Sequence, residues 1–358
     1  MTIPSYTITS NGTAFSSVIS FNSRQGRANK TDVYGASGAS FTVRNPGSIP
    51  VTAVMGALIF VKINTFTIYA GYITNIEYEY GIKSSEDTAT ITLEGYLSFL
   101  GRGYINGFTL TGGTTGAEAQ RVGTALTGSA KTVSNQSTKS LTDTSSYTGA
   151  AQNMITTLVA MEQGRLLEGA TQLYVLGRDV LTNPTLSPNF LTNFKMTDVL
   201  PVSSGISYDS VKFASLDYNY FTQVTVAPAS VATQFAGTGS RNYQISTYDP
   251  TTSQASNLAL YTLGEFNTAT SVPVSISTRN SLSWNFDPAD MISYFPVGWM
   301  LPIAFRGTTY NTVIEGWSIS GSVDDVRYTF FLSGQPQTNF LRLNDTVYGR
   351  LDFNKLGF

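Results

Sequence analysis

The sequence predicts a mainly β, multi-domain protein with a small α+β section in the middle of the chain. Three observations predict this class. Thr, Val, Ile, Tyr and Phe alternate with polar residues along most of the chain, and Gly, Asn, Asp or Ser clusters divide the runs, which is typical of short antiparallel strands. Only two stretches show helical periodicity. Two segments far apart in the chain share one pattern.

The first tube-like β-domain, an antiparallel barrel or sandwich, is predicted over residues 1–105. In ASFTVRN, Phe41 and Val43 fall on one face of a strand, because side chains alternate between the two faces. ALIFVKI, TIYAGYITNIEYEY and DTATITLEGYL follow as further strands. The domain is therefore expected to bury one face of a meander.

An α+β middle domain is predicted over residues 106–212. GAEAQRVGTALTGSA and GAAQNMITTLVAMEQG are the two predicted helices. In the second, Met154, Leu158 and Met161 recur at i, i+4 and i+7. A Ser/Thr-rich loop separates the helices, and RLLEGATQLYVLGRDV predicts a strand, a Gly turn and a strand.

A second tube-like β-domain is predicted over residues 213–334, where the β pattern resumes. Residues 335–358 are predicted to form a C-terminal docking arm. Their sequence includes FLRLNDTVYGRLDFNKLGF, which carries many apolar groups, whereas chain ends are usually polar and frayed unless something orders them. The arm is expected to pack on its own second β-domain or on an adjacent subunit.

The shared pattern predicts an internal duplication that relates the two β-domains. GALIFVKINTFTIYAGYITNI begins at Gly56, and GWMLPIAFRGTTYNTVIEGWSI begins at Gly298. Both give a glycine, an apolar strand, a polar turn and a strand ending in Gly-aromatic, at 71–72 and at 316–317. DTATITLEG and DVRYTFFLSG follow in the same order. The alternative is that two unrelated antiparallel meanders with Gly turns look alike.

Composition excludes several functions. The chain has no His and no Cys, so Ser-His-Asp and Cys-His catalysis, disulfides and the usual zinc sites are ruled out. Charged residues are 12% of the chain and the formal net charge is -2, which gives no electrostatic footprint for nucleic acid or an anionic membrane. No phosphate-binding or dinucleotide motif is present. We expect no signal peptide, no membrane span, no metal and no cofactor.

An enzyme lacking His would have to use carboxylates, as a glycosidase does. Candidate pairs are Glu77 with Glu79, Glu86 with Asp87, and Asp324 with Asp325. A solvated strand face explains the first pair, and turns explain the others. The sequence therefore predicts no catalytic residues and no small-molecule substrate.

Several segments, in order along the chain, resemble the tail hub, or minor tail, proteins of tailed bacteriophages. YAGYITNI, SSEDTATITLEG and YLSFLGRG resemble that family's first domain. NMITTLVAMEQGRLLEGATQLYVLGRD resembles its helix and hairpin, with Glu162, Gly164 and Arg178 in the matching places. TDVLPVSSGISYDSVKFASLDYNYFTQVTV and ISTYDPTTSQASNLALYTLGEF resemble the next strands and a linker, although the Gly expected after Tyr261 is missing. FLRLNDTVYGRLDFNKLGF is similar to the family's ending.

The resemblance implies a structural virion protein at the tail tip or baseplate. Three subunits with two tube-like domains each would form a homotrimeric ring that adapts a six-fold tail tube to a three-fold spike or fibre. The implied partners are a distal tail or tube protein, a spike or fibre and a tape measure protein, and DNA only passes through the lumen. Alternatives are a receptor-binding or carbohydrate-binding tail-tip protein and a distal tail ring protein.

Candidate interface residues lie in the duplicated strands and in the C-terminal arm. They are Tyr72, Ile73, Trp317, Ile319, Leu341, Leu343, Tyr348, Leu351, Phe353, Leu356 and Phe358.

Overall fold

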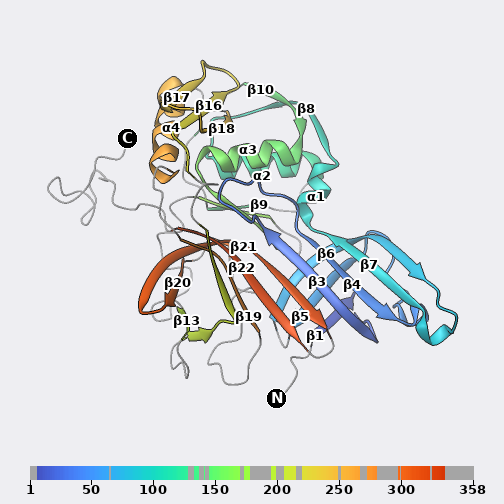
Figure 1. Ribbon diagram of the computed structural model, residues 1–358. Coiled ribbons are helices and arrows are strands. Elements are labelled where there is room, and N and C mark those ends of the chain that lie inside the picture. The colour runs from blue at the N-terminus through green and yellow to red at the C-terminus, as the bar shows by residue number, and fades with distance from the viewer. Residues whose placement is uncertain are drawn as a thin grey trace.

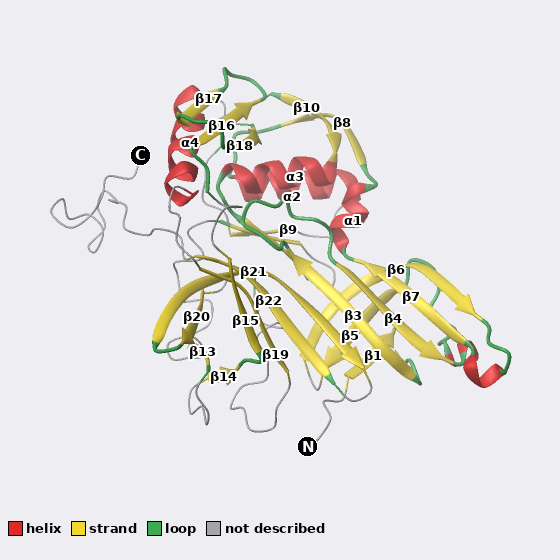
Figure 2. Cartoon of the chain, in the orientation of Figure 1, coloured by secondary structure: helices red, strands yellow, loops and turns green. Residues whose placement is uncertain are grey.

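A computed structural model gives the fold of this chain (Figures 1 and 2). It describes residues 6–63, 66–127, 133–136, 141, 145–169, 173–177, 195–198, 205–214, 220–248, 251–266, 272–279, 297–298, 300–322 and 325–334. The chain is mainly β, as predicted, with helices gathered above one large sheet. No helix in the described ranges is long and apolar enough to cross a membrane.

One 14-stranded sheet contains strands from both ends of the chain. Its N-terminal lobe comprises β1 (Tyr6–Ser10), β2 (Thr13–Ala14), β3 (Val18–Gly26), β4 (Gly38–Arg44), β5 (Leu58–Ile63), β6 (Phe66–Glu79) and β7 (Thr88–Glu94). Its C-terminal lobe comprises β13 (Lys195–Thr197), β14 (Gly205–Ser207), β15 (Ser210–Ala214), β19 (Val272–Arg279), β20 (Met300–Phe305), β21 (Thr308–Ser322) and β22 (Val326–Gly334). The pairings are antiparallel except those of β13 with β14 and β20.

The two lobes repeat five strands in the same order. The N-terminal lobe pairs β3-β4-β7-β6-β5 and the C-terminal lobe pairs β15-β19-β22-β21-β20, each in the same sequence along the chain. The hairpins begin alike, because Gly56 N donates to Ile73 O over 2.8 Å and Gly298 N donates to Ile314 O over 2.7 Å. Both glycines have positive φ, 80° and 90°. Each lobe therefore carries a copy of one β unit.

A β-bulge fixes the residue-by-residue correspondence between the copies. The register shifts just after Ile73 in β6 and just after Ile314 in β21, so Gly316 corresponds to Asn75. The predicted match of Gly56 with Gly298 is confirmed. The predicted match of the two Gly-aromatic pairs is wrong by four residues, because Gly71 lies before the bulge and Gly316 after it.

Side chains repeat as well. Thr42 Oγ1 and Thr90 Oγ1 lie 3.2 Å apart across β4 and β7, and Ser277 Oγ and Thr329 Oγ1 lie 2.9 Å apart across β19 and β22. Thr90 and Thr329 occupy the same place relative to the bulge on the neighbouring strand. The copies thus share a hydroxyl pair besides their strand order.

The lobes join where β21 pairs with β3, from Gly316 opposite Gly26 to Ser322 opposite Ser20. Two glycines face each other at the start of this seam. A Cβ on Gly26, which has a φ of +78°, would lie 2.4 Å from Glu315 O, and one on Gly316 would lie 2.6 Å from Gln25 O. Only glycine leaves room for the backbones to approach this closely.

The middle of the chain supplies helices and three small sheets. Its elements are α1 (Tyr96–Gly101), β8 (Tyr104–Thr109), α2 (Thr115–Thr127), β9 (Val133–Gln136), β10 (Ser146–Ala150), α3 (Ala151–Met161), β11 (Arg165–Glu168), β12 (Leu173–Leu176), β16 (Gln223–Pro228), β17 (Gln234–Gly237), β18 (Asn242–Thr247) and α4 (Thr252–Phe266). Two 3-10 turns, η1 (Pro46–Ser48) and η2 (Ser84–Glu86), lie in the N-terminal lobe. Both predicted helices are confirmed as α2 and α3, and the predicted hairpin is confirmed as β11 with β12.

The prediction of strands throughout 213–334 is wrong at α4. β16, β17 and β18 form a separate three-stranded sheet, and α4 packs on it. Ala255, Leu258, Ala259 and Thr262 are buried at helical spacing, and Thr251 Oγ1 accepts a hydrogen bond from Gln254 N at the helix start. This unit lies beside α3 in Figure 1, apart from the large sheet. The domain ranges stay a prediction.

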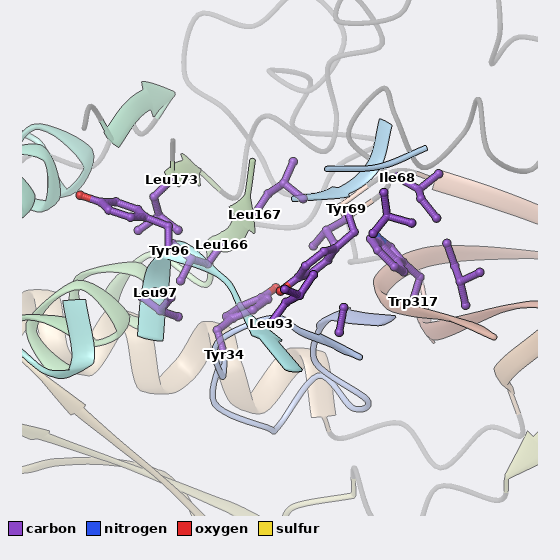
Figure 3. Packing of buried hydrophobic residues seen from close by; sticks show 14 of the residues in the cluster. Tyr34, Ile68, Tyr69, Leu93, Tyr96, Leu97, Leu166, Leu167, Leu173 and Trp317 are labelled. Atoms are coloured by element: carbon purple, nitrogen blue, oxygen red, sulfur yellow. The ribbon is translucent and has the colours of Figure 1, made fainter. Parts of the chain in front are cut away.

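The described residues form two hydrophobic clusters: the larger extends through both lobes and through α1, α2 and α3, and the other lies between α4 and the sheet of β16, β17 and β18. Figure 3 follows the larger cluster from Trp317 past Ile68 and Tyr69 to Leu93 and Tyr96. The Trp317 side chain is fully buried. Because the two lobes share the larger core with α1, α2 and α3, the junction between the lobes is part of the interior of the protein.

Candidate functional site: the junction between the lobes and two unpaired sheet edges

The junction between the lobes is built around a fully buried carboxylate, Glu315, at the β21 bulge. Arg27 Nε donates a hydrogen bond to Glu315 Oε2 over 2.8 Å, and Arg27 Nη2 lies 2.8 Å from the same oxygen. Arg165 Nη2 donates over 2.8 Å to the other oxygen, which also accepts from Ser333 Oγ over 2.5 Å. Glu315 thus joins the end of β3, the start of β11 and β22, that is, both lobes and the middle section.

Two neighbouring arginines keep Glu315 ionised. Burial alone would raise its pKa, but Arg165, Arg27 and the Ser333 hydroxyl hold the pKa of this carboxyl far below its ordinary value. Desolvation opposes the charge on Arg27, yet the Glu315 carboxylate raises the pKa of that guanidinium. The Arg27 guanidinium also lies 4.6 Å from the Tyr34 ring centroid, a cation–π arrangement. The junction is therefore a buried cluster of paired charges in which Glu315 is ionised at neutral pH.

The segment that follows β3 connects the junction between the lobes to α4 and its sheet. Lys30 Nζ forms an ion pair with Glu265, and both side chains are largely buried. The Tyr243 hydroxyl donates to Thr31 O over 3.5 Å. Both contacts anchor the three-stranded sheet and α4 on the segment that leaves the inter-lobe seam.

A second buried carboxylate, Glu168, ties the N-terminal lobe to the helices. Its oxygens accept from Ser37 N over 2.5 Å and from Leu97 N, in the first turn of α1, over 2.9 Å. Burial raises the pKa of Glu168 to about 6, although these backbone bonds favour the charged form. Gln25 Nε2 donates to Glu168 O, so β3 contacts β11 directly.

The copy in the N-terminal lobe leaves one strand edge without a partner among the described strands. β5 pairs with β6 only up to Tyr72, so beyond the bulge β6 pairs with β7 alone. The corresponding edge of β21 is occupied by β3. Tyr78 is 50% and Tyr80 73% exposed, and their rings stack with centroids 6.4 Å apart. An unpaired strand edge, here with exposed aromatic side chains, is a template for pairing with another chain.

β15 has the complementary opening in the C-terminal lobe. It corresponds to β3, but within the described ranges it pairs only with β19. Its residues alternate between exposed and half-buried positions, and Lys212 is exposed. Among the described strands, one seam is complete, that of β3 with β21, and the corresponding edges of β15 and β6 have no partner.

The sequence-predicted interface residues fall in two groups. Ile73, Trp317 and Ile319 are buried inside a single chain, with Trp317 and Ile319 on the β21 segment that pairs with β3, and Tyr72 is half-buried. The structure therefore uses Trp317 and Ile319 at the junction between lobes of one chain. Contacts of these side chains with another subunit stay a prediction.

The seven predicted residues of the C-terminal arm lie outside the described ranges. They are Leu341, Leu343, Tyr348, Leu351, Phe353, Leu356 and Phe358.

The candidate carboxylates that the structure describes lie at the surface. Glu77 and Glu79 are exposed on β6, and Asp87 accepts a hydrogen bond from Gly81 N in a turn. Asp325 lies 3.6 Å from Arg279, while Asp324 is outside the described residues. Within the described ranges no group of three or more carboxylates is placed to hold a metal ion.

A cleft of about 230 Å³ lies beside the junction, between α3 and β18. Arg27, Asp32, Tyr34, Gln163 and Tyr243 are among its lining residues. Its cation, Arg27, is already paired with Glu315, so the cleft offers no unpaired arginine to an anionic ligand.

No protein-family model matches the sequence, and a search of curated proteins finds no match. Among solved structures, a tail protein from Neisseria meningitidis is 13% identical, with a TM-score of 0.67 over 92% of this chain and 96% of its own. The 43 kDa tail protein of prophage MuSo2 from Shewanella oneidensis is 10% identical, with a TM-score of 0.58 over 92% of this chain and 97% of its own.

This chain has the fold of phage tail proteins. The tail-protein fold also occurs in an E. coli component of the type VI secretion system, which is 12% identical with a TM-score of 0.52 over 92% of this chain and 77% of its own. The resemblance found in the sequence is confirmed at the level of the fold.

Proposed function

We propose that this protein is a structural component of a phage tail tip, a hub whose copies close into a ring. The observation that carries the proposal is the duplicated five-strand unit within a tail-protein fold. A ring of three subunits with two copies of the unit each presents six similar positions. It would adapt a six-fold tube to a three-fold spike or fibre.

The proposed partners are those that the resemblance to tail hub proteins implies. A distal tail or tube protein would bind on one side of the ring and a spike or fibre on the other, with the tape measure protein and then DNA passing through the lumen. The chain carries only 12% charged residues and a net charge of -2, which suits surfaces buried between subunits and a lumen that does not hold DNA by charge. The role is structural rather than enzymatic, with no cofactor.

The C-terminal arm is proposed to dock on the ring. Deleting 340–358, the FLRLNDTVYGRLDFNKLGF segment, removes the apolar groups that would seal this contact. We expect the truncated chain to form less oligomer than the full chain, or to aggregate. Light scattering after gel filtration measures the mass of the particles. An unchanged oligomer would contradict the docking role.

The test of the hub itself is particle mass combined with top views by negative-stain microscopy. A three-fold ring with six similar lobes around a hole supports the hub. A ring of six subunits moves the protein to the distal tail ring. A compact monomer that binds glycans favours a receptor-binding protein and overturns the structural role.

A further inference from the structure

We infer that copies of this chain join edge to edge, with β6 of one copy pairing with β15 of the next to continue the sheet. The inference rests on the proposed function for the number of copies, but it specifies the contact. The same two elements of the repeated unit meet inside every chain, where β21 pairs with β3. β6 is the counterpart of β21, and β15 is the counterpart of β3.

The strand pairing that places one unit beside the next already occurs once within each chain. It carries the N-terminal lobe onto the C-terminal lobe through the β3–β21 seam. Applying it again puts the β15 edge of the C-terminal lobe against the β6 edge of another copy. The contact joins two different surfaces, so it is heterologous and generates a ring when the rotation closes.

The register of the second seam follows from the first. β21 pairs Gly321 with Phe21 and Ser320 with Asn22. Counting from the bulge, the counterparts of Gly321 and Ser320 are Tyr80 and Glu79. Through the pairings with β4 and β19, the counterparts of Phe21 and Asn22 are Val211 and Lys212. The predicted neighbours are therefore Tyr80 with Val211 and Glu79 with Lys212.

Side-chain volume is complementary at the first of these pairs. Inside the chain Phe21 lies over Gly321, and a Cβ there would come within 2.1 Å of the Phe21 ring. In the second seam the sizes are exchanged, since the large Tyr80 meets the smaller Val211. Tyr80 is 73% exposed in a single chain, and pairing with β15 would cover it.

Charge is complementary at the second pair. Glu79 and Lys212 are both exposed in a single chain and carry opposite charges. Directly opposite residues on antiparallel strands have Cβ atoms about 4.5–5.5 Å apart, within reach of an ion pair. The internal counterparts, Ser320 and Asn22, are uncharged, so the charges mark the contact between chains.

Cysteine cross-linking tests the seam without background, because the natural chain has no cysteine. Glu79→Cys with Lys212→Cys places the thiols on directly opposite residues, and we expect oxidation of the purified protein to give covalent oligomers ending in a closed ring. Glu79→Cys with Ser210→Cys is the matched control. Its residues are diagonal, about 7–8 Å apart, so we expect at least a tenfold lower yield.

An internal control reports on folding. Ser320→Cys with Asn22→Cys lies at the same place in the seam within the chain, and it should form an intrachain disulfide and no oligomer. Charge reversal is the second arm. Glu79→Lys or Lys212→Glu alone should weaken association roughly two- to fivefold, and the two reversals combined should restore it.

The outcomes separate this contact from the hub. A native three-fold ring in which the first cysteine pair gives no more cross-link than its control overturns the β6–β15 seam and leaves the hub standing. A covalent ring that closes at a number other than three supports the seam and overturns the trimer. Absence of interchain cross-links at tens of micromolar protein, with the internal control oxidised, overturns the seam.

Discussion

Replacing Glu315 by Gln should be among the most destabilising changes of one functional group in this chain. The substitution keeps the shape of the side chain but removes its charge, leaving Arg27 and Arg165 without their shared carboxylate. The Arg165 side chain is only 2% exposed, so water cannot replace the lost partner. Breaking a buried ion pair by removing one member costs about 3–5 kcal/mol, a large part of a total stability of about 5–15 kcal/mol.

The assay is urea denaturation of both proteins at pH 7, with the free energy of unfolding as the measured quantity. Glu94→Gln is the matched control, because Glu94 pairs with Arg102 on the surface, where the side chains are 38% and 65% exposed. Exposed pairs contribute about 0–1 kcal/mol. A loss below about 1 kcal/mol for Glu315→Gln, equal to that of the control, would refute the account of the junction.

The pH dependence of the same pair of proteins gives an independent check. The pKa of Glu315 is lowered in the folded chain, so its contribution is complete above the ordinary value of 4.5 and is lost as the pH falls toward the folded pKa. The difference between wild type and Glu315→Gln should be constant from pH 7 to about 5 and shrink below 4.5. A difference that grows on acidification would contradict the assignment.

Three further results are expected. Gly26→Ala should lower the free energy of unfolding, measured by urea denaturation, by about 2–5 kcal/mol, because Gly26 has a positive φ and an added Cβ would clash with Glu315 O. Gly35→Ala, where the Cβ meets open space, should cost little. Equal losses for the two variants would count against the close approach of the backbones at the seam. Trp317→Ala should cost about 3–5 kcal/mol, since the ring is fully buried, and a loss under 1 kcal/mol would contradict this. Burial raises the pKa of Glu168 from 4.5 to about 6, so this residue should lower the free energy of unfolding by about 2 kcal/mol as the pH rises from 4 to 7. Glu168→Gln should remove this pH dependence. The same pH dependence in wild type and Glu168→Gln would refute the assignment to Glu168.

The sequence predicts the strands and the duplication because both leave local signals. Alternation such as that of Phe41 and Val43 specifies the buried face, and both were found on it. Gly56 and Gly298 were matched correctly because a glycine before an apolar strand is visible in any reading. The α4 helix was missed although Ala255, Leu258, Ala259 and Thr262 recur at helical spacing, because the segment was matched to a linker of the tail hub family.

The junction cluster could not be found in this way. Arg27 and Glu315 are 288 residues apart, and neither has a local pattern that distinguishes it from a surface residue. The register at the bulge brings Glu315 inward, and that register depends on long-range strand pairing. The same limit explains why Trp317 was matched to Tyr72 rather than to Ile76: a bulge is invisible until both strands are placed.

Stiffness is unevenly distributed in such an assembly. Within a chain, the inter-lobe seam is held by facing glycines, a buried three-part ion cluster and a common core, so the two lobes move as one body. A seam between chains would have a short strand, β15, and charges in contact with water. If a ring widens to let a long polymer through, the strain falls on the contacts between chains, and each subunit acts as a rigid segment between compliant joints.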